Sequence, residues 1–185
     1  MWFTQFFQGI ADLLTTAVNA VSGYRTFFGG SNDDVLFGSN QNDIMYGRDG
    51  KDWLVAKDGN DILYGGANDD RLVGGGGENT LYGGGGSDDF VVSILDTGGG
   101  RTEIADFDPR RDKLVIEYSA AEPTGVEAAT ELATDAMRGF ERSNIGGSGD
   151  AVFFIGKHLI VLEDYFDDYD VGDMRGIDVE LALLG

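Results

Sequence analysis

The clearest pattern of hydrophobic and polar positions lies between residues 29 and 91, where a nine-residue unit recurs seven times without interruption. The units are GGSNDDVLF, GSNQNDIMY, GRDGKDWLV, AKDGNDILY, GGANDDRLV, GGGGENTLY and GGGGSDDFV. The eighth position is always apolar: Leu36, Met45, Leu54, Leu63, Leu72, Leu81 and Phe90. The sixth position is Asp34, Asp43, Asp52, Asp61, Asp70, Asn79 and Asp88 in turn. An unbroken short period indicates a solenoid, in which successive turns stack on one another.

Each unit predicts a tight loop followed by a short strand. Glycine or asparagine early in the unit allows the positive φ angles of a tight loop. The last three positions predict a strand, and because strand side chains alternate between faces, the eighth position points inward. The seventh and ninth positions then point outward.

The outward positions predict two different surfaces. On the sheet formed by the even-numbered units, the tyrosines at the ninth position should stack as a ladder about 4.8 Å apart. This surface consists of Ile44, Tyr46, Ile62, Tyr64, Thr80 and Tyr82. The other sheet presents Val35 and Phe37, then Trp53 and Val55, and becomes more polar toward its C-terminal end. Apolar outer surfaces indicate either burial under another part of the chain or a self-assembly or partner surface, with Tyr46, Tyr64, Tyr82, Ile44, Ile62, Phe37 and Trp53 as candidates.

A different period precedes the repeats. Apolar residues from Phe3 to Val21 recur at spacings of three and four, which predicts one amphipathic helix over residues 2–22. A cleavable signal peptide is disfavoured, because there is no positive n-region and Gln8, Gly9 and Asp12 interrupt the apolar core. The segment is also too polar for a transmembrane span.

Three roles for this helix remain open. It can cap the open first turn of the solenoid, dock on another subunit, or lie on a membrane surface. No Lys or Arg precedes Arg25, so attraction to anionic lipid is weak.

Beyond Val92 the nine-residue period stops. Residues 93–100 predict a loop, and residues 101–105 and 113–118 predict strands around a turn at 106–112. Residues 127–138 predict a helix, and residues 151–155 and 159–162 a hairpin that places His158 in a solvated turn. The chain therefore divides into an N-terminal helix or cap (1–28), the repeat array (29–92) and a β-rich capping region (93–185).

Charge narrows the function classes. With 33 acidic and 13 basic residues, the net charge of −20 excludes nucleic-acid binding through phosphates and opposes compaction unless cations neutralise it. There is no cysteine, so disulfides and thiolate metal sites are excluded.

The repeat resembles the RTX calcium-binding nonapeptide, G-G-x-G-x-D-x-U-x, where U is a large apolar residue. The resemblance implies a right-handed parallel β-roll that is mainly β, in which two units make one turn. It also implies Ca²⁺ between loops stacked eighteen residues apart, bound by carboxylates and backbone carbonyls. The implied ligand row on one edge is Asp34, Asp52, Asp70 and Asp88, and on the other Asp43, Asp61 and Asn79. These rows enclose about five ions, the weakest beside Asn79, and folding should depend on Ca²⁺.

Some loops depart from the pattern. Ser39 and Gln41 replace glycines in the second loop, and Ala56 and Lys57 replace both opening glycines of the fourth. We expect these departures to affect the occupancy of single sites rather than the architecture.

The stretch IADFDPRRDKLVI resembles the segment that closes the roll in serralysin-type C-terminal domains. The tail, residues 177–184, resembles the uncleaved C-terminal export signal of type I secretion substrates, although such apolar tails commonly complete a sheet. The expected location is therefore extracellular or on the cell surface, without a cleaved N-terminal signal.

Catalytic groups are not evident. His158 is the only histidine, so the H-E-x-x-H zinc site of serralysin proteases is absent. Asp167, Asp168, Asp170 and Asp173 indicate an acidic surface or a further cation site.

The sequence favours a non-enzymatic, calcium-dependent secreted protein. It would act in assembly at a cell surface, in a matrix or in a filament, with itself or another extracellular protein as partner. A secreted carboxylate-dependent enzyme such as a polysaccharide hydrolase and a monomeric binding module are the alternatives. A sugar- or ice-binding face is not favoured, because the outward positions form no regular threonine ladder.

Overall fold

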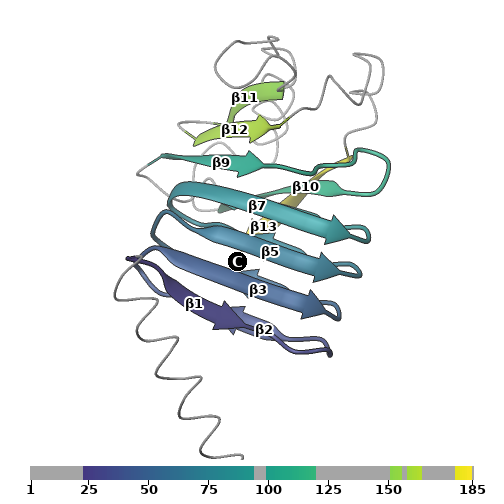
Figure 1. The fold of residues 1–185 in the computed structure, drawn as a ribbon. Coiled ribbons are helices and arrows are strands. Elements are labelled where there is room, and N and C mark those ends of the chain that lie inside the picture. Colours follow the sequence, from purple (N-terminus) through teal and green to yellow (C-terminus); the bar gives the residue numbers. More distant parts are fainter. Residues whose placement is uncertain (1–22, 94–98, 120–150, 156–157, 164–177, 185) are drawn as a thin grey trace, which may run out of the picture.

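The computed structural model describes residues 23–93, 99–119, 151–155, 158–163 and 178–184 (Figure 1). The helices expected over 2–22 and 127–138 and the acidic cluster at 167–173 lie outside these residues. Within them, no helix is long and apolar enough to cross a membrane.

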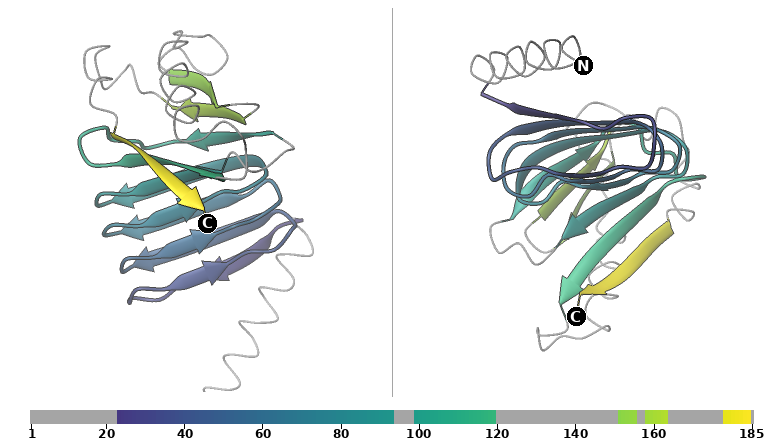
Figure 2. Two further views of the ribbon diagram at one scale, coloured as in Figure 1. Left: turned by 180° about the vertical axis from the view of Figure 1, so that it is seen from behind. Right: turned by 90° about the horizontal axis from the view of Figure 1, so that it is seen from below.

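The described chain forms two sheets that face each other, as the views in Figure 2 show. Sheet A has the order β1-β3-β5-β7-β9-β12-β11, and sheet B has the order β13-β10-β8-β6-β4-β2. The strands of sheet A are β1 (Arg25–Phe28), β3 (Asp43–Asp49), β5 (Ile62–Ala67), β7 (Gly77–Gly85), β9 (Gly100–Ile104), β11 (Ala151–Ile155) and β12 (His158–Leu162). Those of sheet B are β2 (Val35–Phe37), β4 (Trp53–Val55), β6 (Arg71–Val73), β8 (Asp89–Ser93), β10 (Lys113–Ser119) and β13 (Asp178–Leu184).

The repeat array forms the predicted parallel β-roll. Met45 pairs with Leu63 and Leu54 with Leu72, so each residue of the array lies beside the residue eighteen positions later. Consecutive units alternate between sheets, and two units complete one turn. The loops of odd-numbered units therefore line one edge of the roll and those of even-numbered units the other.

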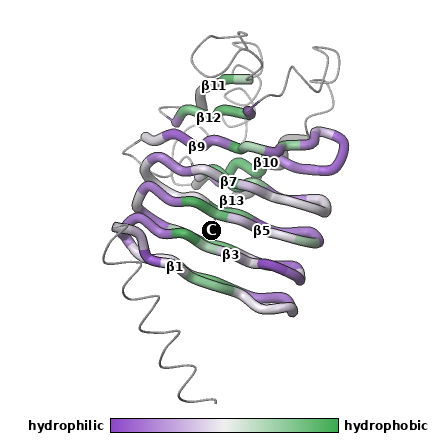
Figure 3. The backbone as a smooth tube through the Cα atoms, in the orientation of Figure 1, coloured by the Kyte–Doolittle hydropathy of each residue, from purple (hydrophilic) through white to green (hydrophobic). Residues whose placement is uncertain are grey.

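The eighth positions form the core between the sheets. Met45, Leu54, Leu63, Leu72, Leu81 and Phe90 have no exposed surface, and Leu36 packs against them at the first turn. In Figure 3 the strand centres carry the hydrophobic colour and the connecting loops the hydrophilic colour. The inward direction predicted for the eighth position is thus confirmed for these residues.

The roll extends beyond the seven units at both ends. Upstream, β1 pairs in parallel with β3, and Phe27 lies beside Met45 at the eighth position. Residues 25–28 therefore belong to the roll rather than to a separate N-terminal region. Downstream, β9 and β10 continue sheets A and B in parallel register, so the roll continues although the sequence period stops at Val92.

The turn that contains β9 takes the eighth place, and residues 107–115 form a concealed ninth unit, FDPRRDKLV. Lys113 pairs with Asp89 and Leu114 with Phe90, which places Asp112 at the sixth position and the buried Leu114 at the eighth. The glycines are replaced and the spacing is interrupted, so the continuation was not evident from the period.

The hairpin β11–β12 and the tail strand β13 complete the sheets. Ile155 pairs with His158 in an antiparallel arrangement, while β12 pairs in parallel with β9. His158 is only 4% exposed, and Thr102 Oγ1 lies 2.8 Å from its Nε2. The prediction of a solvated turn histidine is therefore wrong, because the strand begins at His158. The tail pairs with β10 and completes sheet B, which is the alternative to an export signal that the sequence left open.

Candidate metal sites

The sixth positions form two rows of polar side chains that are buried although they come directly after surface loops. Row one, on the edge that leads into sheet B, contains Asp34, Asp52, Asp70 and Asp88 and continues to Asp112. Row two, on the edge that leads into sheet A, contains Asp43, Asp61 and Asn79 and continues to Thr102. All except the half-buried Asp34 are at most 3% exposed. The structure thus brings the predicted ligand residues together in the two predicted rows.

One oxygen of most sixth-position side chains accepts a hydrogen bond from the backbone of the preceding turn; the acceptors are Asp52, Asp61, Asp70, Asn79, Asp88 and Asp112. The Asp52 backbone N–H donates to Asp70 Oδ1 at 2.8 Å, and the Asp70 N–H donates to Asp88 Oδ1 at 2.8 Å. In row two, the Asp61 N–H donates to Asn79 Oδ1 at 3.0 Å. These bonds set the spacing between turns, and an asparagine supports them as well as an aspartate does.

The loops differ in whether the other carboxylate oxygen, Oδ2, has a hydrogen-bond partner. Oδ2 has no hydrogen-bond partner in the buried side chains of Asp52, Asp61, Asp70 and Asp88. A buried carboxylate oxygen without a partner is strongly destabilising unless a cation is bound to it. We call these four atoms the open oxygens.

The remaining loops satisfy Oδ2 internally. The Gly30 N–H donates to Asp34 Oδ2 at 2.6 Å, and the Ser39 N–H donates to Asp43 Oδ2 at 2.5 Å. In the ninth unit, the Asp108 N–H donates to Asp112 Oδ2 at 2.8 Å. These three loops close around their own carboxylates.

Backbone conformation accompanies this difference. From the third to the seventh unit, the second and fourth positions both have positive φ, for example Lys57 at 82° and Gly59 at 140°. The second and fourth positions of the first two units do not. The open oxygens therefore occur only in loops with the left-handed pair, which turns the N–H of the second position away from the carboxylate. Lys57 adopts this conformation without glycine, so the fourth loop keeps the common geometry despite its departure from the pattern.

The first position of each loop has little space. A Cβ on Gly65 would lie 2.5 Å from Asp70 Oδ2 and 2.7 Å from the Gly83 carbonyl oxygen. The open oxygen and a carbonyl from the next turn therefore approach the same point of the loop. Only a small residue at the first position permits this approach.

Row two loses its charge toward the C-terminus. The loop of Asn79 has the same backbone geometry as the loops with open oxygens, but Asn79 Nδ2 donates to the Gly75 carbonyl oxygen at 3.2 Å. Thr102 lies at the next rung and contacts His158. Neutral side chains thus replace carboxylates where the sequence predicted the weakest site.

Burial shifts the pKa values of the aspartates that carry the open oxygens. Desolvation raises the pKa of Asp61 and of Asp70 to about 7, and that of Asp88 to about 6, against the hydrogen bond from the preceding backbone N–H. Desolvation also raises the pKa of Asp52 and of Asp112. These groups carry a penalty as anions that a nearby cation would remove.

The donor set fits Ca²⁺. In the described part of the chain, no three His, Cys, Asp or Glu side chains form a single cluster. A cation at an open oxygen would therefore be bound by carboxylate and backbone carbonyl oxygens, the all-oxygen set that a hard cation prefers. When bound, Ca²⁺ would neutralise the buried carboxylate. The chain supplies the oxygens, the left-handed loop geometry and the exclusion of water.

Stacked parallel turns with buried, partly unpartnered carboxylates at the loops define a cation-binding β-roll. Residues 28–63 and 64–91 match the family model described as "RTX calcium-binding nonapeptide repeat (4 copies)". This part of the chain is an array of RTX calcium-binding repeats, and the expected resemblance is confirmed.

Two solved structures show partial similarity. The extracellular lipase LipA from Serratia marcescens shares 24% identity over 83% of this chain, with a TM-score of 0.27, and the chain spans 20% of the lipase. The AlgE6R3 subunit from the Azotobacter vinelandii mannuronan C5-epimerase shares 28% identity over 80% of this chain and 77% of that one, with a TM-score of 0.30. At these scores the similarities bear on neither activity nor substrate. No curated protein matches the chain.

Proposed function

We propose that this protein is a non-enzymatic, calcium-dependent extracellular protein that folds when Ca²⁺ binds and then acts as an assembly component. The observation that supports it best is the set of four open oxygens, at Asp52, Asp61, Asp70 and Asp88. Each is buried in a loop of common geometry, and none has a hydrogen-bond partner.

The open oxygens also bear on the number of ions. About five were expected from the gaps between stacked loops. The closed loops of Asp34 and Asp43 and the neutral Asn79 favour one ion at each open oxygen, which makes four in the described residues.

An extracellular location is supported by the weak ligand set. Sites with few carboxylates suit the high free Ca²⁺ found outside cells, where modules bind with dissociation constants of about 10⁻⁴ to 10⁻³ M. RTX repeats are consistent with this location. The export route, expected to be type I secretion, stays a prediction.

Assembly is supported by the outer face of sheet A. Its ring ladder joins Phe28, Tyr46, Tyr64 and Tyr82, with centroid distances of 5.3, 5.0 and 4.7 Å and near-parallel planes. Ile44 and Ile62 lie beside it on the same face. The Arg48 guanidinium lies over the Phe28 end of the ladder, 5.1 Å from the ring centroid, while the seventh and ninth positions on this face from Ile44 to Tyr82 are uncharged. On a chain of net charge −20, copies can approach through such a surface with little repulsion.

The test combines sedimentation velocity with far-UV circular dichroism across a Ca²⁺ titration. We expect β signal to rise first and large species to follow once folding is complete. Tyr64→Lys should leave the folding midpoint unchanged and keep the protein monomeric. Val73→Lys, in the same turn on the outer face of sheet B, is the matched control. A wild type that folds but stays monomeric at all protein concentrations would refute assembly and leave a monomeric binding module.

A further inference from the structure

The outer face of sheet B changes character at Trp53. Toward the N-terminal end it presents Val35 and Phe37, which are 56% and 55% exposed. Toward the C-terminal end Arg71 and Asp89 continue the column of Val35 and Trp53, whereas the column of Phe37 stays apolar. Trp53 itself is 45% exposed, and its ring lies 6.4 Å from that of Phe37 at an angle of 56°. In the column of seventh positions, an exposed indole therefore lies between an apolar residue and charged ones.

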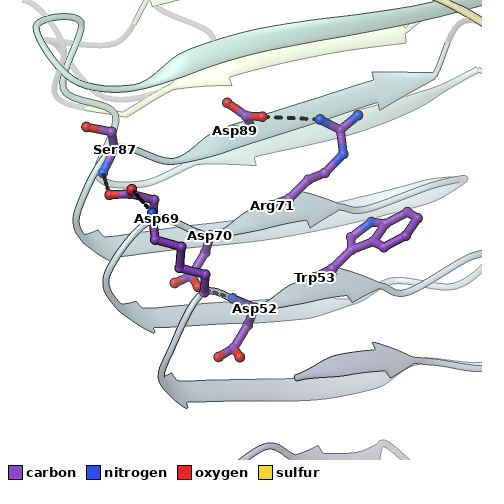
Figure 4. A pocket seen from close by; sticks show the side chains of 8 residues that line it. Asp52, Trp53, Asp69, Asp70, Arg71, Ser87 and Asp89 are labelled. Carbon is purple, nitrogen blue, oxygen red and sulfur yellow. Dashed lines mark hydrogen bonds and ion pairs between the residues drawn. The ribbon is translucent and has the colours of Figure 1, made fainter. Parts of the chain in front are cut away.

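A hollow of about 430 Å³ opens beside Trp53, between the loops of row one and sheet B (Figure 4). Its polar lining comes from Lys51, Asp52, Asp69, Asp70, Arg71, Ser87 and Asp89, so two candidate metal ligands, Asp52 and Asp70, lie at its wall. In Figure 4, Trp53 and Arg71 project side by side from neighbouring strands.

The charged groups of the hollow are held by one another. Lys51 Nζ donates to Asp69 Oδ2 at 2.5 Å, and Asp69 Oδ1 accepts from the Ser87 N–H at 3.0 Å. The Arg71 guanidinium bridges Asp89 at 3.2 Å and Glu117 at 3.1 Å. These contacts fix the side chains but use only one of the three donors of Lys51 and two of the five of Arg71.

This lining selects among ligand classes. A polyanion would meet a chain of net charge −20, and a basic peptide would have to compete for Asp69 and Asp89, which already face Lys51 and Arg71. The open oxygens of Asp52 and Asp70 are buried and are the ones assigned above to Ca²⁺. An uncharged sugar presents an apolar face of C–H groups for an indole ring, and hydroxyls that donate and accept toward paired charges. We propose that the hollow beside Trp53 binds an uncharged polysaccharide, with Trp53 under a sugar ring and Lys51 and Arg71 donating to its hydroxyls.

The site depends on calcium but not on the association of copies. Lys51 and Asp69 immediately precede Asp52 and Asp70, two of the residues with open oxygens. The hollow therefore exists only when the loops of row one are stacked. It goes beyond the assembly proposed above, which uses the outer face of sheet A.

The test uses the full chain carrying Trp2→Phe, which leaves Trp53 as the only tryptophan. Its emission is titrated with cellohexaose, chitohexaose, maltohexaose and mannohexaose in Ca²⁺, with isothermal calorimetry in parallel. Sedimentation selects a protein concentration at which the protein is monomeric, and circular dichroism confirms that the roll is folded. A failure of calcium-dependent folding is thus seen separately from a failure of sugar binding.

We expect a saturable change in emission with at least one oligosaccharide, which chelation of Ca²⁺ abolishes. Trp53→Ala, followed by calorimetry, should abolish binding, and Lys51→Ala should weaken it about three- to tenfold, in line with one lost hydrogen bond. Tyr46→Ala, on the opposite sheet, should bind as the unaltered protein does.

Four results would overturn the proposal. The first is no response to any of these sugars from a folded roll, and the second is a response only to a polyanion such as polygalacturonate. The third is binding that Trp53→Ala leaves intact. The fourth is a Trp53 ring shielded from acrylamide in the absence of sugar. Concentration-independent shielding would indicate that residues 1–22 cover the ring, and concentration-dependent shielding would indicate a second copy.

Discussion

The two rows of sixth-position side chains both connect stacked turns, but they do so with different residue types. Row one keeps an aspartate at every turn from Asp34 to Asp112, whereas row two changes from aspartate to Asn79 and then to Thr102. After their first rungs, Asp34 and Asp43, both rows hold the preceding turn through a side-chain oxygen of aspartate or asparagine. At these rungs stacking uses only a hydrogen-bond acceptor, which asparagine supplies as aspartate does. We therefore predict that any dependence of folding on Ca²⁺ arises from the second carboxylate oxygen, separately in each loop.

Removal of Ca²⁺ should have the largest effect. Each site filled to 100 times its dissociation constant contributes about 2.7 kcal/mol, so four such sites contribute about 11 kcal/mol. That equals the entire free energy of unfolding of many domains, about 5–15 kcal/mol. We expect a chelator to abolish the β-sheet signal in circular dichroism at neutral pH, and re-addition of Ca²⁺ to restore it. A chelated protein that kept its β signal would show that the rows stack without ions.

Two substitutions at Asp70 distinguish the contributions of its two carboxylate oxygens to stability. Asp70→Ala should lose both the ion and the acceptor for the Asp52 N–H, whose burial without a partner adds about 1–3 kcal/mol. Asp70→Asn should lose only the ion, because it keeps the acceptor and can donate as Asn79 does. Urea unfolding in saturating Ca²⁺ should give the highest free energy of unfolding for the wild type, a lower one for Asp70→Asn and the lowest for Asp70→Ala. Equal losses from the two variants would contradict the separate roles of the oxygens.

Acid should stabilise the calcium-free roll. In the folded state, burial raises the pKa of Asp61 and Asp70 to about 7 and that of Asp88 to about 6, from the ordinary value of 3.8. The folded state therefore binds more protons than the unfolded state between about pH 4 and 7, and its stability falls as pH rises through this window. Without Ca²⁺, β signal should increase as pH is lowered from 7.5 to 5. With Ca²⁺, the same change should raise the Ca²⁺ midpoint, because protons compete for the carboxylates.

Asn79→Asp should make row two resemble row one. The new carboxylate would face the Gly75 carbonyl oxygen in place of the present Nδ2 donor, at a separation of 3.2 Å. We expect a loss of about 1–3 kcal/mol at low Ca²⁺ and one additional bound ion at high Ca²⁺. Calorimetric stoichiometry measures the second effect. An unchanged ion count would mean that row two cannot bind an ion at this turn.

Thr102→Val should have the smallest effect. It removes the buried contact between Thr102 Oγ1 and His158 Nε2, with a loss of about 1 kcal/mol. Since no open oxygen lies at this rung, the Ca²⁺ midpoint should not move. Thermal unfolding in saturating Ca²⁺ measures the loss, and a shifted midpoint would tie this rung to the metal sites.

The array could be predicted because one rule, polar at the sixth position and apolar at the eighth, repeats at constant spacing. The ends could not, because each end breaks a different part of that rule. In β1, Arg25 replaces the aspartate, and only Phe27 keeps the pattern. In the ninth unit Asp112 and Leu114 keep both positions, so their spacing was the signal that could have found it.

The sequence identified the residues of the candidate metal sites, but it did not show which of their carboxylates have an oxygen without a hydrogen-bond partner. The sequence identified the aspartates of both rows, yet the closed loops of Asp34 and Asp43 depend on backbone angles that one glycine or serine does not specify. The hollow beside Trp53 depends on side chains from three turns and has no local signal.

The eighteen-residue register has a consequence for the order of folding. Within the array, each new turn needs the chain to close only a short loop onto the turn before it, which is entropically easy. Growth can therefore proceed one turn at a time once a first pair of turns exists. The closing pairings are different, because β13 joins β10 and β12 joins β9 across much longer stretches of chain. Contacts at such separation form slowly. The array should therefore assemble first, and capture of the C-terminal strands should set the time at which folding is complete.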